Sequence, residues 1–134
     1  MPILNFTQHD CTQDQLDAGI LDCDPEYKQE LVRLLTFEEI PTSSEVWNRA
    51  VRIVTLFELV AVSMGYSYGN EQTSLHPMIG GVPFLMSLLE DAFEDAGLTP
   101  YYAFSKRVSE DQVQPDGSIK KVSTFKHVGL YKVS

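Results

Sequence analysis

The sequence has few cysteines and no long uninterrupted apolar run. Its two cysteines, Cys11 and Cys23, are too few for the disulfide scaffold of a small secreted domain. The longest apolar stretch, Val51–Met64, is interrupted by charged and hydroxyl side chains and is shorter than the roughly 20 residues that cross a bilayer. The chain also shows no basic and apolar start of the secretory type. We therefore expect a reduced, cytoplasmic protein with no membrane partner.

Basic residues are also scarce, and the formal net charge is −9 at pH 7. Because nonspecific binding to nucleic acid needs a basic surface, we expect no duplex nucleic acid as a partner. The charge is unevenly spread: residues 1–100 contain 16 acidic and 4 basic side chains, whereas residues 101–134 contain 3 acidic and 6 basic ones. The C-terminal segment can offer a positive site to a small anion, or its lysines can simply alternate along the solvent face of strands.

Several motifs of cofactor and metal chemistry are missing. Neither the glycine pattern of dinucleotide-binding folds nor the phosphate loop of ATPases occurs, so we expect no dinucleotide cofactor and no ATP hydrolysis. The spacing of His9, Cys11 and Cys23 matches no standard zinc pattern, and no nucleophile elbow, H-E-x-x-H or C-x-x-C is present. We expect neither a metal nor another cofactor.

Length and hydrophobic content predict one domain spanning residues 1–134. Thr12 and Gln15 form a capping box for a helix at about 12–18, and Asp24 with Pro25 begins a second helix. A third helix begins near Thr42 and ends at Gly65, and a loop is expected from Tyr66 to Ser74. We expect a fourth helix over about 83–96 and strands over 2–6, 20–23, 75–79, 100–104 and 119–133.

This order of elements predicts an α/β fold with an open, mainly parallel Rossmann-like sheet and helices on both faces. Asp116-Gly117 is a hairpin signal, so the last two strands should form a C-terminal antiparallel hairpin. The first strand, Pro2–Phe6, is short and wholly apolar apart from its asparagine, which is typical of a strand in the interior of a parallel sheet. We expect it to be central, with a strand order of 2-1-3-4-5.

In such sheets, ligands bind beyond the carboxyl ends of the strands, where the strand order reverses. Thr7-Gln8-His9-Asp10 follows the first strand, and Gly80-Gly81 follows the third and opens a helix. Glycine lets backbone N–H groups approach a ligand closely, and a helix N-terminus favours an anion. A plain tight turn is the alternative interpretation of Gly80-Gly81.

A third segment, Ser105-Lys106-Arg107, follows the fourth strand and is expected to face the same edge of the sheet. A hydroxyl, an ammonium and a guanidinium in a row suit a phosphate, although a solvated strand end would look the same. His9 lies at this edge and could take or give a proton near neutral pH. His127, in the last strand, could do so if a phosphate lies nearby, whereas His76 is expected to be structural.

Some of these segments also carry a family resemblance. Ile3–His9 with Thr12–Gln15, the glycine turn and helix of Met78–Met86, the run Thr99–Arg107, and the closing segment Asp116–Val128 contain the residues concerned. Together they resemble small CRISPR-associated proteins with a Rossmann-like, CARF-type fold. The likeness leaves out residues 36–74.

The resemblance implies a homodimer that holds a cyclic oligoadenylate across its two-fold axis. Some proteins of this type sense the ring, and small stand-alone ones linearise it without a metal, as ring nucleases. Two other classes stay open: a nucleotide-binding module without catalysis, and a protein-interaction module. The resemblance implies ligand-binding roles for Thr7, Gln8, Gly80 and Gly81, and catalytic roles for His9, Ser105, Lys106 and Arg107.

Overall fold

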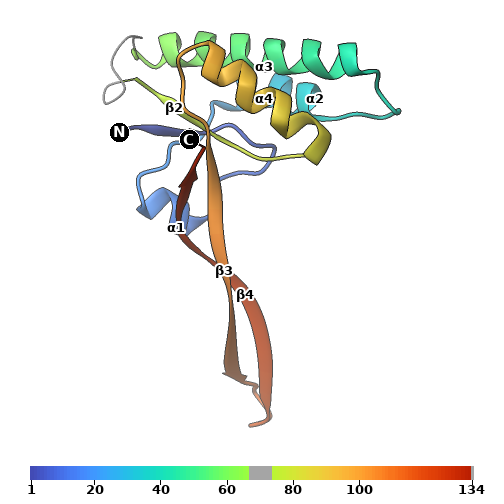
Figure 1. Ribbon diagram of the computed structural model, residues 1–134. Coiled ribbons are helices and arrows are strands. Elements are labelled where there is room, and N and C mark those ends of the chain that lie inside the picture. The colour runs from blue at the N-terminus through green and yellow to red at the C-terminus, as the bar shows by residue number, and fades with distance from the viewer. Residues whose placement is uncertain (67–73, 134) are drawn as a thin grey trace.

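The computed structural model describes residues 1–66 and 74–133 and has an α/β fold built on a four-stranded sheet (Figure 1). The sheet order is β1-β2-β3-β4; β1 with β2 and β2 with β3 are parallel, and β3 with β4 form an antiparallel hairpin. This confirms the mainly parallel sheet and the C-terminal hairpin. The loop expected at 66–74 falls largely on residues 67–73, outside the described residues.

The elements are β1 (Ile3–Asn5), α1 (Gln13–Asp17), α2 (Pro25–Leu35), α3 (Ser43–Ser63), β2 (His76–Ile79), α4 (Pro83–Asp95), β3 (Tyr101–Val113) and β4 (Ile119–Lys132).

The strand expected at 20–23 is reduced to a single parallel bridge between Leu21 and Leu4. The carbonyl oxygen of Leu21 accepts from the N–H of Asn5 at 2.7 Å, and the N–H of Leu21 donates to the carbonyl oxygen of Ile3 at 2.9 Å. The bridge stops there because Asp22 turns its carboxylate toward another loop and α2 begins shortly afterwards. Pro2–Phe6, expected to be central, is therefore the outermost full strand, with one bridged residue beyond it.

Side-chain caps begin three helices where the sequence predicts them. The Thr12 hydroxyl accepts from the N–H of Gln15, whose side chain in turn accepts from the N–H of Thr12, so the capping box of α1 is complete. Asp24 accepts from the N–H of Glu26 at the start of α2, and Thr42 caps α3 in the same manner. These local contacts satisfy backbone donors that a helix leaves free at its first turn.

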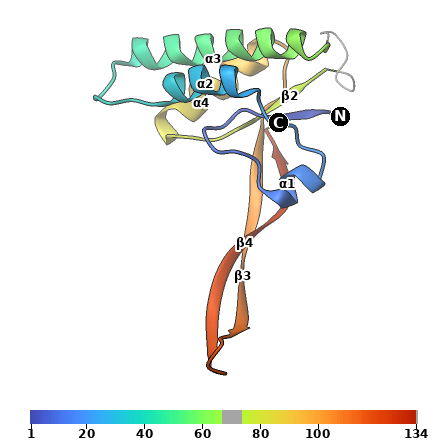
Figure 2. The same ribbon diagram turned by 180° about the vertical axis from the view of Figure 1, so that it is seen from behind.

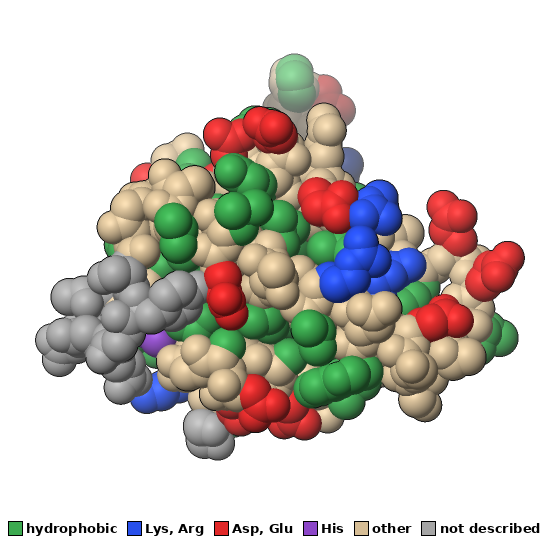
Figure 3. Space-filling view, turned by 90° about the horizontal axis from the view of Figure 1, so that it is seen from above, with side chains coloured by type: hydrophobic (Ala, Val, Ile, Leu, Met, Phe, Trp, Pro, Cys, Tyr) green, Lys and Arg blue, Asp and Glu red, His purple; other side chains and the backbone are tan. Residues whose placement is uncertain are grey.

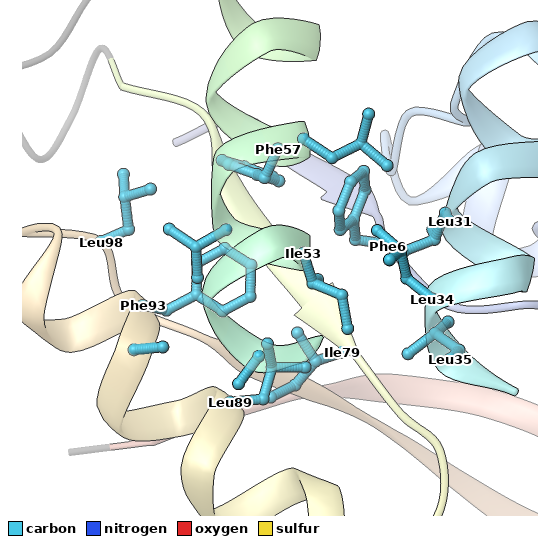
Figure 4. Close-up of a cluster of buried hydrophobic side chains, with 14 of the residues drawn as sticks. Phe6, Leu31, Leu34, Leu35, Ile53, Phe57, Ile79, Leu89, Phe93 and Leu98 are labelled. Atoms are coloured by element: carbon cyan, nitrogen blue, oxygen red, sulfur yellow. The ribbon is translucent and has the colours of Figure 1, made fainter. Parts of the chain in front are cut away.

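The main core lies between the sheet and the layer of α2, α3 and α4 (Figure 4). Phe57 of α3 packs edge to face on Phe6, with ring centroids 5.2 Å apart, and on Phe93 of α4 at 5.3 Å. The opposite face of the sheet carries a smaller cluster that includes Met78 and Tyr101. The short α1 covers this side and contacts β4 near the base of the hairpin (Figure 2).

The outer side of α3 is mixed in character. Hydrophobic side chains are partly exposed on it between charged ones (Figure 3). These side chains are three or four residues apart in two pairs, Trp47 with Val51 and Leu59 with Val62. They are 41–62% exposed. Among residues 1–66 and 74–133, no helix is both long enough and apolar enough to cross a membrane.

The hairpin of β3 and β4 extends away from the body as a long arm (Figures 1 and 2). The strand expected to end at Phe104 continues to Val113, and every residue from Ser105 onward pairs with β4. The sequence gives little strand signal in this part because neither face of the arm is buried, so the usual alternation of apolar and polar residues is absent. The turn is the predicted one, with Gly117 at a φ of 84° and Asp116 accepting from the N–H of Ser118.

Candidate functional site

A cavity of about 460 Å³ lies at the carboxyl ends of β1 and β2. It combines the loop after β1 with the glycine turn after β2, two segments far apart in the sequence that adjacent parallel strands bring together. The position matches the edge at which open parallel sheets bind ligands. Five of the residues expected at the site are among those that line the cavity: Thr7, Gln8, His9, Gly80 and Gly81, together with Asp10, Thr12, Gln15, Met78, Ile79, Tyr102 and Ala103.

Asn5, the last residue of β1, shapes the loop that lines the cavity. Its side chain is 1% exposed. The Nδ2 atom donates to the carbonyl oxygen of His9 at 2.7 Å and to Asp22 Oδ1 at 3.1 Å. The Oδ1 atom accepts from both the backbone N–H and the hydroxyl of Thr7, at 3.1 and 2.7 Å. One buried amide thus sets the course of the chain from Thr7 to His9.

Asp22 and Cys11 hold the far end of this loop. The carboxylate of Asp22 accepts from the backbone N–H of Cys11 at 3.0 and 3.3 Å. Burial by itself would raise the pKa of Asp22, but hydrogen bonds from Cys11 and Asn5 and the charge of Lys28 lower it below its ordinary value. Burial, reinforced by Asp22, raises the pKa of the Cys11 thiol to about 12. Cys11 therefore stays protonated at neutral pH and serves as a structural thiol.

Lys28 of α2 places a positive charge next to the cavity. Its ammonium donates a 2.7 Å hydrogen bond to the carbonyl oxygen of His9, the same oxygen that Asn5 contacts. The sequence patterns did not single out Lys28, because its approach to His9 depends on how α2 packs. They could have singled out Asn5, since a buried amide in an apolar strand must find several hydrogen-bond partners.

The glycine turn leads directly into α4, whose N-cap residue Val82 provides no side-chain cap. Val82 and Phe84 at the helix start line a separate cavity, and Pro83 has no N–H, so the glycine turn rather than the helix start borders this cavity. Gly81 has a φ of 153°, and a Cβ atom there would lie 3.3 Å from Met86 Cε. A Cβ on Gly80 would lie 3.4 Å from Thr7 Cγ2, which is ordinary contact. Backbone geometry thus requires glycine at position 81 more than at position 80.

The lining side chains carry little positive charge. They include one carboxylate, Asp10, and one imidazole, His9, with no lysine or arginine among them. Attraction for an anion must then come from the backbone N–H groups of the glycine turn and from the neighbouring Lys28. The hydroxyl of Thr7 and the amide of Gln8 add neutral hydrogen-bonding groups. This combination suits a ligand that has both a phosphate and polar ring or sugar groups.

Ser105, Lys106 and Arg107 do not line the cavity, because β3 continues through them into the arm. The expectation that they follow a strand end was wrong. Alternate residues of a strand share a face, so Ser105 and Arg107 lie on the same face as the cavity-lining Ala103, and Lys106 lies on the other. The guanidinium of Arg107 lies 5.7 Å from the ring centroid of its cross-strand partner Phe125.

The two remaining histidines differ in their surroundings. His76 is buried in β2, and its Nδ1 atom accepts from the backbone N–H of Thr99 at 3.0 Å, which is a structural role. His127 is the cross-strand partner of Ser105. In the described part of the chain, its Nδ1 atom is buried without a hydrogen-bond partner. Ser105, Arg107 and His127 thus share one face of the arm near its base.

Comparison with known proteins assigns the chain to a family. A model described as the "Uncharacterized protein MJ1673 family" matches residues 1–131, so the chain belongs to this family. No curated protein and no solved structure matches the chain.

Proposed function

We propose that this member of the MJ1673 family binds a cyclic oligoadenylate in the cavity at the carboxyl ends of β1 and β2. The observation that carries the proposal is the convergence of Thr7–His9 and Gly80–Gly81 on one cavity. Backbone N–H groups of a glycine turn favour a phosphate without requiring a basic surface, which agrees with the acidic chain. The resemblance of these segments to CARF-type proteins supports a cyclic oligoadenylate as the phosphate ligand.

In this proposal, one phosphate of the ring lies against the N–H groups of Gly80 and Gly81. Thr7 and Gln8 then contact sugar or base groups with their hydroxyl and amide, and His9 lies at the exposed rim. Pockets that hold one drug-sized ligand have volumes of about 300–1,000 Å³. A ring of several nucleotides is larger than such a ligand, so a cavity of about 460 Å³ is too small to hold the whole ring. Two copies facing each other across a two-fold axis would each hold part of the ring.

A ring that extends from the cavity over Ala103 reaches the face of β3 that carries Ser105 and Arg107. There the 2′-hydroxyl of one nucleotide can attack the adjacent phosphorus. The P–O2′ bond forms, the P–O5′ bond breaks, and the products are a 2′,3′-cyclic phosphate and a 5′-hydroxyl. His9 accepts the proton of the 2′-hydroxyl, a water molecule protonates the leaving 5′-oxygen, and Arg107 stabilises the added negative charge. Positioning and electrostatics supply such an acceleration without a metal.

The test of binding is a thermal-denaturation screen against cyclic and linear oligoadenylates. A ligand at about 100 times its dissociation constant should stabilise the folded protein by about 2.7 kcal/mol. Gln8→Ala should weaken the binding several-fold. Gln13→Ala is the matched control, because Gln13 is also an exposed glutamine but its amide bonds to Asp17 on α1. Absence of stabilisation by every oligoadenylate, or equal effects of the two variants, would refute the proposal.

The alternative is a module that binds the nucleotide and does not cut it. The placement of Ser105 and Arg107 outside the cavity favours this alternative for any ligand small enough to stay inside. A time course of the bound ring with and without EDTA separates the two. Appearance of linear products with cyclic phosphate ends in both conditions indicates a metal-independent nuclease, whereas an intact ring indicates a sensor.

A further inference from the structure

The arm carries more exposed hydrophobic surface than a solvated hairpin needs. Six large hydrophobic side chains of β3 and β4 are 58–76% exposed, and the arm stands clear of the helices (Figures 1 and 2). A two-stranded ribbon is only marginally stable by itself in water, and a group of exposed apolar side chains usually marks a contact surface. Two of them lie at the tip, where Val113 (76%) faces Ile119 (67%) across the strands.

The same chain has an apolar groove on its helical layer. A cavity of about 680 Å³ lies between the end of α2 and the starts of α3 and α4. Phe37 and Phe84 form one wall with ring centroids 5.1 Å apart, and Ile40 at the rim is 99% exposed. Glu38 and Glu39 also line the groove. In Figure 3, acidic and hydrophobic side chains gather at the right-hand end, where Figure 1 shows the connection from α2 to α3.

Tip and groove are complementary in chemistry. Lys120 and Lys121 follow Ile119 directly at the tip, where Asp111 lies opposite Lys121, and the apolar groove is bordered by two glutamates. In the described part of the chain, none of these lysines and glutamates forms an ion pair. The two larger segments also have opposite net charges, because residues 101–134 carry +3 and residues 1–100 carry −12.

We infer that the arm tip of one copy of this chain docks into the groove of a second copy. Val113 and Ile119 fill the apolar floor, and Lys120 and Lys121 pair with Glu38 and Glu39. Both copies have an arm and a groove, so a reciprocal exchange closes the assembly as a two-fold dimer. This dimer does not depend on the oligoadenylate, and it gives the proposed homodimer a defined contact surface.

Other occupants fit the observations less well. A chain cannot reach its own groove, because its arm leaves the body in the direction away from α3 (Figures 1 and 2). Edge-to-edge pairing of two β4 strands is opposed by the four lysines of β4, which has no acidic residue. A nucleic acid is opposed by the net charge of −9 of the chain.

The experiment is a concentration series of the full chain without ligand, by sedimentation equilibrium. We expect a dimer whose dissociation constant rises at least about tenfold in Glu38→Lys/Glu39→Lys and in Lys120→Glu/Lys121→Glu, and returns toward the original value when all four changes are combined. Asp91→Lys/Glu94→Lys is the matched control, because it makes the same change in net charge on exposed residues of α4 away from the groove. Circular dichroism verifies that each variant is folded.

The outcomes separate cleanly. Weakening by both double variants, rescue by the combination, and an unaffected control support the arm-and-groove contact. A monomer at all concentrations up to roughly 100 µM overturns it, as does a dimer that Glu38→Lys/Glu39→Lys and Lys120→Glu/Lys121→Glu leave unchanged. Binding of a single-stranded RNA that is lost in Lys120→Glu/Lys121→Glu while self-association persists would also overturn it, in favour of a nucleic-acid arm. Each of these results is independent of whether an oligoadenylate binds in the other cavity.

Discussion

Asn5 donates a 2.7 Å hydrogen bond from its buried amide to the carbonyl oxygen of His9, so a side chain within β1 determines the shape of the cavity rim. Lys28 contacts the same oxygen from α2. Sheet and helix therefore meet at one carbonyl group of the loop. The loop residues Thr7 and Gln8 owe their position to this arrangement rather than to packing of their own side chains.

Asn5→Ala should destabilise the fold by about 1–3 kcal/mol, because it removes a buried amide together with its hydrogen bonds to Thr7, His9 and Asp22. It should also weaken binding at the cavity. Urea denaturation measures the first effect and ligand titration the second. Asn48→Ala, on the exposed side of α3, should change stability by less than about 0.5 kcal/mol. Equal effects of the two substitutions would show that the amide of Asn5 does not organise the loop.

Gly81→Ala should cost more than Gly80→Ala. At position 81 the φ of 153° disfavours any side chain, and the added methyl group would lie 3.3 Å from Met86 Cε. At position 80 the nearest atom is a flexible methyl group of Thr7 at 3.4 Å. We expect a loss of about 1–3 kcal/mol for Gly81→Ala and a smaller one for Gly80→Ala, measured by thermal denaturation. The reverse order would mean that the turn has a different backbone path.

The parts of the fold that follow local rules could be predicted from the sequence. Thr12, Asp24 and Thr42 begin helices because their side chains cap neighbouring N–H groups, and Asp116-Gly117 makes its turn by the same kind of local chemistry. The convergence of His9 and Gly80 on one cavity could also be predicted, because adjacent parallel strands end at the same edge of the sheet.

The parts that depend on long-range contacts could not be predicted. Leu21 forms one bridge and no strand, because the hydrogen bonds of Asp22 redirect the chain. β3 continues past Phe104 only because β4 lies alongside it, and the mixed residues from Ser105 to Val113 show no pattern of a buried face. For this reason the site residues of that segment were expected at the cavity, and the structure instead places them on the arm.

The Cys11 thiol should make stability fall at alkaline pH. Its pKa is raised from 9.0 to about 12 in the folded protein, mainly by burial and also by Asp22. The native state then holds this proton more tightly than the unfolded state, so the contribution to stability is present below pH 9 and is lost as the pH rises toward 12. Cys11→Ala should reduce this alkaline loss in urea denaturation without abolishing it, because the pKa of Cys23 is also raised, to about 11. An unchanged pH dependence would contradict the assignment.

The arm tip should be protected from hydrogen exchange only when two copies associate. Backbone amides near Val113 and Ile119 belong to a ribbon that is exposed on both faces, so they should exchange quickly in a monomer. Raising the protein concentration should slow them if the tip docks in a groove, while amides of β1 stay unchanged. In Glu38→Lys/Glu39→Lys the tip should exchange quickly at every concentration. Concentration-independent protection would indicate that the tip contacts its own chain.

Arg107 and Lys106 offer the sharpest test of ring cleavage, because they are adjacent cations on opposite faces of β3. Arg107 shares the face of Ala103, which lines the cavity, and Lys106 does not. If a ring extends from the cavity along this face, Arg107→Ala should lower the cleavage rate about 10²–10³-fold, in the range seen when one charge-stabilising donor is removed. It should change the dissociation constant of the ring much less, since the guanidinium acts on charge that develops in the transition state. Lys106→Ala is the internal control and should leave both quantities within about twofold. Single-turnover assays with EDTA present separate cleavage from binding. Equal losses in the two variants would mean that the arm acts through general positive charge, and no loss in either would remove this face of β3 from the mechanism.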